Sequence, residues 1–371
     1  MNLLVDCHVF DSEFQGSRTV IIGMYSKLFE LENRMPSGNI YFLAAENVDN
    51  LKKEFPPTPF IRYVELKASS SWKRLLFEFP YLIRKHKINY AHFQYVVPPI
   101  KLCKYIVTCH DVLFLDFPEY FSTAYRLSKR VMFKLSYRYS DVVTTVSMYS
   151  YNRIRHYFGN KEHFYAIPNG IDEKFFDFQS SETKLSWLHR KKIRPYILYV
   201  SRFEPRKNHL LLLQVFSEKK LYNQVDLVMI GSKTHLCADF EKYYNQLPEF
   251  IKSAIHINQN GVSQKEVMLY MKHAEVFVYP SIAEGFGLPP LEAAALKTPV
   301  ICNNSSSMAD FSILGRFLTV LNTNTLSKML EQVLKEGVPN DEKEKIASEI
   351  RVNYSWDMAA IKFQSILAAL N

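Results

Sequence analysis

The chain has 371 residues, which is more than one ordinary hydrophobic core holds, so two domains are expected. Apolar residues make up 47% and charged residues 22%, the composition of a globular protein. The net charge of +9 is spread over both halves, with 23 basic against 18 acidic residues in 1–178 and 23 against 19 in the remainder. Because there is no basic tail or arm, nucleic-acid binding is excluded, and a phosphorylated substrate or an acidic membrane surface is the favoured anionic partner.

The five cysteines, Cys7, Cys103, Cys109, Cys237 and Cys302, form no C-x-x-C pair. They are predicted to be buried thiols in a reducing compartment, with no disulfide framework or zinc site. The sequence enters a strand-like run directly, with neither a basic leader nor a cleavage site, and no apolar run approaches the roughly 18 residues of a membrane span. We therefore expect a cytoplasmic location.

Short apolar runs typical of strands alternate with helix-patterned stretches along the chain. In the first half, strands are expected at 2–8, 40–45, 61–66, 90–93, 104–110, 141–147 and 164–168, and helices at 19–31, 72–86, 122–139 and 148–157. In the second half, strands are expected at 196–201, 225–231, 255–258, 276–281 and 299–303, and helices near 207–219, 238–247, 263–272 and 288–296. This alternation predicts parallel sheets with helices on both faces.

A polar segment at 175–194 lacks such a pattern and precedes a new strand. The fold class predicted from this organisation is α/β, with two doubly wound, Rossmann-like domains facing a cleft, the first at 1–178 and the second at 195–355. The final helix, 356–371, is predicted to pack back on the first domain. In such sheets, ligands bind beyond the carboxyl ends of the strands, often at a helix N-terminus.

Residues 276–300, VFVYPSIAEGFGLPPLEAAALKTPV, form the most informative segment. A strand is followed by a loop from Glu284 to Gly287 and by a helix that is expected to start around Leu288. The glycines let the backbone approach a ligand, and the helix start offers unpaired N–H groups worth roughly 0.3–2 kcal/mol toward an anion. Because Glu292 lies about one turn into the helix, the two glutamates are expected to address different parts of one elongated ligand.

A second segment, YILYVSRFEPRKNHLLLLQVF, places Arg202 and Lys207 across a turn between a strand and a helix. Two such cations can clamp a pyrophosphate, and each charge-assisted bond is worth about 1.5–3 kcal/mol. Arg206, between them, is expected to point away. In isolation, such a pair is more often two ordinary surface cations.

Together these segments resemble the donor site of the family-4 retaining glycosyltransferases, which have the GT-B fold. The resemblance implies that Glu284 contacts hydroxyls of the transferred hexose, that Glu292 holds the ribose diol, and that Arg202 and Lys207 neutralise the leaving diphosphate. It makes the second domain the nucleotide-sugar donor domain and the first the acceptor side. The remaining donor-binding positions are Gly16, Gly231, Val262, Gly285, Phe286, Gly287 and Leu288.

The first half is similar to the same family. Residues 108–122, TCHDVLFLDFPEYFS, resemble the T-x-H-D loop of bacterial polysaccharide mannosyltransferases. His110 falls just after a strand, and the resemblance implies a catalytic position against the donor sugar and the acceptor. Asp111 and Arg18 are assigned to the acceptor side. A lone histidine is otherwise more often structural.

Two departures from the family pattern concern loops. The first loop, FDSEFQGSRTV, is usually rich in glycine but here contains only Gly16, which leaves open which backbone groups approach the donor or the acceptor. Beyond NNSSSMAD, residues 303–310, the usual turn with Pro and Glu is missing, so that this rim of the nucleotide pocket is expected to differ.

Four basic residues repeat at every fourth position of one expected helix, beside three apolar ones. The basic residues are Arg126, Arg130, Lys134 and Arg138, and the apolar ones are Leu127, Val131 and Leu135. Such a stripe could bind an anionic lipid surface, where a polyprenyl-linked acceptor would reside. The alternative is a solvated outer face of the helix, which is the more common case.

The sequence therefore predicts a retaining transferase that moves a hexose, with a slight lean to mannose, from GDP-mannose or a UDP-sugar to a glycan or polyprenyl-linked acceptor in bacterial surface polysaccharide synthesis. No metal-ligand cluster and no glycosidase-type carboxylate pair is visible, so metal-independent catalysis by positioning and electrostatics, without a separate cofactor, is expected. A sugar-nucleotide epimerase and a non-catalytic nucleotide-sugar-binding protein remain alternatives. A nicotinamide dehydrogenase is excluded because neither half has G-x-G-x-x-G after its first strand.

Overall fold

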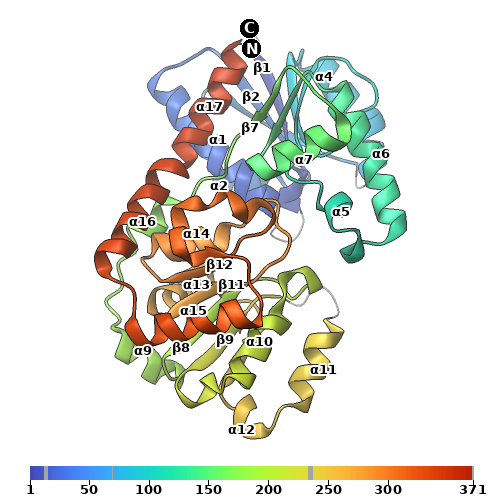
Figure 1. Ribbon diagram of the computed structural model, residues 1–371. Coiled ribbons are helices and arrows are strands. Elements are labelled where there is room, and N and C mark those ends of the chain that lie inside the picture. The colour runs from blue at the N-terminus through green and yellow to red at the C-terminus, as the bar shows by residue number, and fades with distance from the viewer. Residues whose placement is uncertain (12–15, 69, 233–236, 370–371) are drawn as a thin grey trace. The chain divides into compact units, whose positions relative to one another are not determined.

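The computed structural model describes residues 1–11, 16–68, 70–232 and 237–369. The chain forms two compact units, Met1–Gly170 with Trp356–Asn371, and Ile171–Ser355 (Figure 1). Each unit is built on one parallel sheet, as the alternating pattern predicted. All five cysteines are free thiols, of which four are buried and Cys103 is half-buried.

The sheet of the first unit has seven parallel strands in the order β3-β2-β1-β4-β5-β6-β7. The strands are β1 (Asn2–Asp6), β2 (Ile40–Ala45), β3 (Ile61–Glu65), β4 (Tyr90–Gln94), β5 (Lys104–Thr108), β6 (Val142–Thr145) and β7 (Phe164–Ala166). The helical elements are η1 (His8–Asp11), α1 (Gly16–Arg34), α2 (Val48–Glu54), α3 (Ser71–Lys73), η2 (Arg74–Glu78), α4 (Phe79–Lys85), α5 (Leu113–Asp116), η3 (Pro118–Tyr120), α6 (Thr123–Tyr139), α7 (Met148–Phe158) and α17 (Trp356–Ala369). The strands read as continuous apolar runs because helices cover both faces of a parallel sheet.

The last helix, α17, packs against α1 within this unit (Figure 1). A Cβ atom at Gly23 of α1 would lie 2.1 Å from the indole of Trp356. Phe363 lies two turns after Trp356 in α17. The centre of its ring is 5.8 Å from that of Tyr25 and 5.3 Å from that of His92. Because Gly23 has no side chain, α17 can approach α1 closely, and the two helices pack together.

The sheet of the second unit has six parallel strands in the order β10-β9-β8-β11-β12-β13. The strands are β8 (Tyr196–Val200), β9 (Asp226–Ile230), β10 (Ile255–Asn258), β11 (Val276–Tyr279), β12 (Val300–Asn303) and β13 (Leu318–Thr319). The helical elements are α8 (Glu173–Phe176), α9 (Lys184–Lys191), η4 (Pro205–Lys207), α10 (His209–Glu218), η5 (Leu221–Asn223), α11 (Ala238–Gln246), α12 (Glu249–Lys252), α13 (Gln264–His273), α14 (Leu288–Ala295), η6 (Ser306–Asp310), η7 (Ser312–Phe317), α15 (Thr323–Glu336) and α16 (Asn340–Asn353).

The segment 175–194 is not the irregular stretch that its polar composition suggested. It contains α9, whose Trp187 is fully buried and donates a hydrogen bond of 3.2 Å to the hydroxyl of Tyr196. The ring of Trp187 also packs edge-on against Tyr270 at 4.8 Å. One large aromatic side chain thus anchors a polar helix to the second unit. None of the described helices is long and apolar enough to span a membrane.

The strand order reverses once in each sheet, between β1 and β4 in the first and between β8 and β11 in the second. At such a point the flanking helices go to opposite faces and leave a crevice at the carboxyl ends of the strands, where ligands bind. In the second unit these strand ends lead into the turn 201–207 and the loop 280–287. These are the two segments in which the sequence placed the paired cations and the first glutamate.

Candidate active site

The loop 280–287 is shaped by glycine at its last position. Gly287 has a φ of 97°, in the left-handed region that favours glycine, and precedes α14, which begins at Leu288 as predicted. A Cβ atom on Gly287 would lie 3.3 Å from the side chain of Met308. Pro289 and Pro290 follow in the first turn of α14, where no backbone hydrogen bond is lost. The start of α14 lies close to Glu284, whose Cγ would be 3.8 Å from a Cβ atom on Gly287.

A buried ion pair joins the two loops. The ammonium group of Lys207 donates a hydrogen bond to Oε1 of Glu284, and both side chains are more than nine-tenths buried. The hydroxyls of Tyr279 and Ser281 donate to the same oxygen, at 2.8 and 2.6 Å. Oε1 of Glu284 thus accepts three hydrogen bonds, which fixes the position of the carboxylate.

The two charges are retained despite their burial. Burial by itself would raise the pKa of Glu284, but Lys207 and Arg206 outweigh it and lower this pKa to about 2. Burial lowers the pKa of Lys207 to about 8, against the opposing attraction of Glu284. Both groups are therefore mainly ionised at neutral pH, and each supplies the partner that the other needs in a low-dielectric surrounding.

Arg206 does not point away, as was expected from its place between Arg202 and Lys207. The 3₁₀ turn η4 brings its guanidinium to Glu204 at 2.7 Å and to Oε2 of Glu284 at 3.3 Å. It also donates to the backbone carbonyl of Ala283. The prediction was wrong because two buried carboxylates, Glu204 and Glu284, require a cation between them.

Arg202 is the exposed member of this cluster. Its side chain is 52% exposed and contacts Glu204 at 3.2 Å. The cluster as a whole has three cations, Arg202, Arg206 and Lys207, against two carboxylates, Glu204 and Glu284, so one positive charge is in excess. That excess lies at the carboxyl ends of strands beside a reversal of strand order, an arrangement suited to an anionic ligand.

The segment 303–310, beyond which the turn with Pro and Glu is missing, supports the loop 280–287. Three consecutive serine hydroxyls bind its backbone: Ser305 donates to the Ile282 carbonyl at 2.7 Å, Ser306 accepts from the Glu284 amide at 2.9 Å, and Ser307 donates to the carbonyls of Glu284 and Phe286 at 2.9 and 2.7 Å. No role for these serines was predicted from the sequence. Their only signal was a run of three hydroxyl residues directly after an expected strand.

Glu292 lies in the second turn of α14 and is half-buried. Burial raises its pKa to about 7; Lys174 opposes the shift and Asp172 adds to it. Since the ordinary value is 4.5, ionisation of Glu292 costs folding stability as the pH rises from 4.5 to about 7. Ligand hydroxyls that donate to this carboxylate would stabilise its ionised form.

The other predicted donor-side residues occupy loops and strand ends of the second unit. Gly231 follows β9 with a φ of 157°, and a Cβ atom there would lie 1.9 Å from the carbonyl oxygen of Ser201, so this glycine allows the ends of β8 and β9 to pack. Val262 precedes α13 and Gly285 lies in the loop 280–287; both are half-buried. The ring of Phe286 is buried against Phe311 and Tyr354, at 5.5 and 6.0 Å.

The predicted residues of the first unit lie just after β5 and in the first turn of α1. His110 is buried just after β5, and its Nε2 lies 2.7 Å from Oε1 of Gln94, a residue that the sequence analysis did not single out. Burial lowers the pKa of His110 to about 4, so that the ring is neutral at pH 7. Asp111 accepts a hydrogen bond of 3.1 Å from the backbone of Leu113.

Gly16 and Arg18 belong to the first turn of α1. Arg18 pairs with Glu54 at 3.2 Å, and its guanidinium lies 4.9 Å from the centre of the Phe10 ring. Residues 12–15 of the first loop lie outside the described residues. Within the described ranges, no group of three or more His, Cys, Asp or Glu side chains is placed to hold a metal ion.

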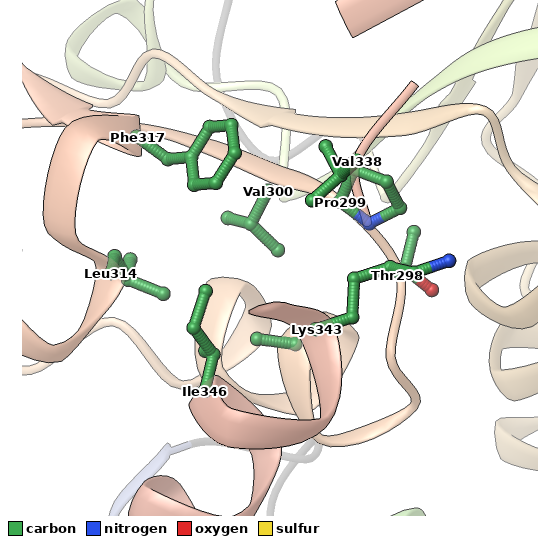
Figure 2. A pocket seen from close by; sticks show the side chains of 9 residues that line it. Thr298, Pro299, Val300, Leu314, Phe317, Val338, Lys343 and Ile346 are labelled. Carbon is green, nitrogen blue, oxygen red and sulfur yellow. The ribbon is translucent and has the colours of Figure 1, made fainter. Parts of the chain in front are cut away.

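A small apolar cavity of the second unit lies where β12 begins, at the end of the strand opposite to the ion-pair cluster. Figure 2 shows Leu314, Phe317 and Ile346 around it, together with residues 298–300 at the start of β12. These residues precede or begin the strand, whereas the ion-pair cluster follows the strand ends. With an apolar lining and a single charged residue, Lys343, this cavity does not match a nucleotide-sugar site.

Two family models match the chain. The model described as "Glycosyl transferases group 1" matches residues 182–351, and that described as "Glycosyltransferase Family 4" matches residues 29–175. The O-antigen chain mannosyltransferase RfbU of Salmonella typhimurium is 27% identical over 199 residues, which make up 53% of this chain and 51% of that protein. The chain thus spans about half the length of this curated relative.

Solved structures share the fold. The sucrose-phosphate synthase of Thermosynechococcus elongatus superposes with a TM-score of 0.77 at 17% identity, covering 100% of this chain and 98% of the other. HepE of Anabaena, in complex with UDP and glucose, superposes with a TM-score of 0.72 at 17% identity, covering all of both chains. At this identity the likeness concerns the fold, which is GT-B.

Arg206 and Arg202 offer a matched test of the cluster. Arg206→Met is expected to lower the free energy of unfolding by about 3 kcal/mol, because it removes a cation from two buried carboxylates. Arg202→Met should cost less than about 1 kcal/mol, because exposed ion pairs contribute little. Urea unfolding can be followed by tryptophan fluorescence, to which Trp187 contributes from the second unit and Trp72 and Trp356 from the first. Equal losses in the two variants would contradict the placement of Arg206.

Proposed function

The chain belongs to the family-4 glycosyltransferases, and we propose that it transfers a hexose from a nucleoside diphosphate sugar to a glycan or lipid-linked glycan with retention at the anomeric carbon. The observation that carries this proposal is the cluster of Lys207, Arg206 and Glu284 beside the reversal of strand order in the second unit. It combines an excess positive charge for a diphosphate with a fixed carboxylate for sugar hydroxyls.

Lys207 and Arg202 would bind the diphosphate. An ammonium group has three hydrogen-bond donors, and among the described residues Lys207 uses one, toward Glu284. Two donors are left for phosphate oxygens. Arg202 adds a planar fork of donors on an exposed side chain. The start of α14 adds the backbone N–H groups of Gly287 and Leu288, because Pro289 and Pro290 have none. These groups would stabilise the charge that builds on the departing diphosphate.

Glu284 would orient the hexose. Its Oε1 already accepts from Lys207, Tyr279 and Ser281, whereas Oε2 contacts Arg206 at a longer distance of 3.3 Å. Among the described residues, Oε2 thus has fewer hydrogen-bond partners than Oε1, and it retains capacity for a sugar hydroxyl. Glu292 would accept the two ribose hydroxyls. His110, on the first unit, would contact the transferred sugar.

The bond between the anomeric carbon and the diphosphate oxygen breaks, and the acceptor oxygen bonds the same carbon on the same face. We assign the acceptor proton to an oxygen of the leaving diphosphate. No protein carboxylate then has to act as nucleophile, and positioning and electrostatic stabilisation supply the rate. We propose that the reaction is independent of metal ions. The likeness to mannosyltransferases, one of which is named as GDP-mannose-dependent, favours GDP-mannose slightly over a UDP-sugar.

The direct test follows release of nucleoside diphosphate from candidate donors, with and without acceptor and with and without EDTA. Acceptor-dependent release supports transfer, whereas conversion of the sugar without release would identify an epimerase. Absence of release and of conversion for every donor would leave a binding protein. A donor screen by thermal shift chooses the sugars and bases to assay.

Two substitutions distinguish the contact with the diphosphate from the contact with the ribose. Arg202→Ala is expected to lower turnover about 10- to 100-fold with a small change in donor affinity, because its contact strengthens as charge builds on the diphosphate. Glu292→Ala is expected to weaken donor binding about tenfold or more by removing charge-assisted hydrogen bonds. Arg316, 48% exposed and paired with Glu342, is a matched control, and Arg316→Ala should change neither value. Normal turnover in the Arg202 variant would remove this residue from the mechanism.

We further propose that α6 contacts an anionic membrane surface, where a polyprenyl-linked acceptor would reside. Leu127, Val131 and Leu135 of this helix are 62%, 59% and 51% exposed, which is unusual for a merely solvated face. They alternate with the basic side chains at 126, 130, 134 and 138. An apolar groove beside α6 is lined by Met132, Leu135 and Tyr139 together with Trp72, Leu75 and residues 96–99. Exposed apolar groups next to cations match the interface of an acidic bilayer.

Vesicle flotation tests this contact. The protein is expected to float with phosphatidylglycerol-containing vesicles, to float less at high salt, and to remain unbound with pure phosphatidylcholine. Leu127→Ser with Val131→Ser should lower the bound fraction about threefold or more. Leu185, 80% exposed in the second unit, gives the control variant Leu185→Ser, which should bind as the wild type does. Unchanged binding in the double variant would contradict the role of α6.

A further inference from the structure

Gln94 and His110 form a buried pair at the carboxyl edge of the first sheet. Gln94 is the last residue of β4, and His110 follows the end of the neighbouring strand β5. Both residues are more than nine-tenths buried, and Oε1 of Gln94 lies 2.7 Å from Nε2 of His110. Because β4 borders the reversal of strand order, this pair occupies the edge where a doubly wound sheet binds its ligand.

His92, on the same face of β4, shows the pattern of a purely structural histidine. Its Nδ1 lies 2.7 Å from the hydroxyl of Tyr25, and its Nε2 lies 2.7 Å from the hydroxyl of Thr108. Both of its ring nitrogens are therefore bonded within the protein. By contrast, the ring of His110 is hydrogen-bonded within the described part of the chain through Nε2 alone, to Gln94. The Nδ1 atom of His110 is left for a ligand.

The side-chain carbonyl of Gln94 can only accept a hydrogen bond, so Nε2 of His110 must carry the proton. In a neutral imidazole, Nδ1 then has the lone pair. We propose that Gln94 is a positioning residue that holds His110 in the Nε2–H tautomer, so that Nδ1 accepts a hydrogen bond from a hydroxyl of the donor hexose. Burial keeps the pKa of His110 near 4, and the ring therefore stays neutral at physiological pH.

Two costly features accompany the pair. The amide nitrogen of Gln94 is buried and finds no hydrogen-bond partner in the described ranges. Tyr95, the next residue, has a φ of 63°, which is strained for a side chain of this size. Its ring lies 5.1 Å from that of His110 and stacks on Phe133 at 4.9 Å. Unpaired buried donors and strained backbone are retained mainly at functional positions, which supports a functional role for this pair.

This inference rests on the proposed function for the identity of the ligand, while the tautomer can be measured without activity. Two-bond ¹H–¹⁵N spectra of the full chain, labelled with ¹⁵N-histidine, distinguish protonated from unprotonated ring nitrogens. The signals of His110 are identified by their loss in His110→Asn. In the wild type at pH 7.5, we expect a protonated Nε2 and an unprotonated Nδ1.

Gln94→Leu removes the acceptor, and we expect His110 to become a mixture of tautomers while the signals of His92 stay in place. Gln94→Glu keeps an acceptor of similar size and should preserve the wild-type tautomer while raising the pKa of His110. If the leucine variant does not fold, the glutamate variant decides the matter. An unchanged tautomer in folded Gln94→Leu, or a neutral His110 ring with its single proton on Nδ1 in Gln94→Glu, would overturn the proposal.

Loss of the Gln94 acceptor is expected to lower the turnover of the enzyme and to change its affinity for the donor little. Gln94→Leu should reduce kcat for nucleoside diphosphate release at least tenfold and change KM for the donor less than threefold. Gln94→Glu should restore most of the lost turnover. An altered tautomer with normal kcat would overturn the positioning role while leaving the proposed function standing. If the wild type releases no nucleoside diphosphate, the proposed function and the contact with the sugar are both overturned. The spectra still show which tautomer His110 adopts, and so test the role of Gln94.

Discussion

The buried ion pair between Lys207 and Glu284 is the interaction on which the second unit's site depends. It joins the turn after β8 to the loop after β11, two segments that are far apart in the sequence and neighbours at the reversal of strand order. Because neither charge tolerates burial alone, each loop is held where the other can neutralise it. Arg206 extends the pair to Glu204 and leaves the cluster with one positive charge in excess. The same interaction thus holds the two loops together at the place where we propose that the diphosphate binds.

The surroundings of this pair are held by hydrogen bonds within the protein. The hydroxyls of Tyr279 and Ser281 complete the contacts of Glu284 Oε1, and serines 305–307 hold the backbone of the loop through their own hydroxyls. Gly287 then lets the chain turn into α14. Groups that are fixed in advance need no reorganisation when charge develops on a bound diphosphate, which is how such a site stabilises a transition state. The Gln94–His110 pair shows the same principle in the first unit.

The sequence predicted the features that follow from periodicity and strand ends. The expected strands, the start of α14 at Leu288 and the position of His110 after β5 are confirmed. It did not predict the placement of Arg206, because the direction of a side chain in a 3₁₀ turn depends on which carboxylates are buried beside it. The roles of Ser306 and Gln94 were missed for a related reason. Their partners are backbone or side-chain atoms of other segments, and no spacing in the sequence marks such contacts. Helix α9 was missed because its burial depends largely on Trp187.

The most direct test of the central claim measures whether the Lys207 cluster binds a diphosphate. Calorimetric titration with UDP and GDP, and with uridine and guanosine, can compare Glu284→Gln with the double variant Glu284→Gln, Lys207→Met, which leaves no unpaired carboxylate at position 284. If Lys207 binds the diphosphate, the double variant should bind the preferred nucleoside diphosphate at least about tenfold more weakly, as expected for loss of a charge-assisted contact. Its affinity for the nucleoside should not change. Equal affinities of the two variants for the nucleoside diphosphate would contradict the account.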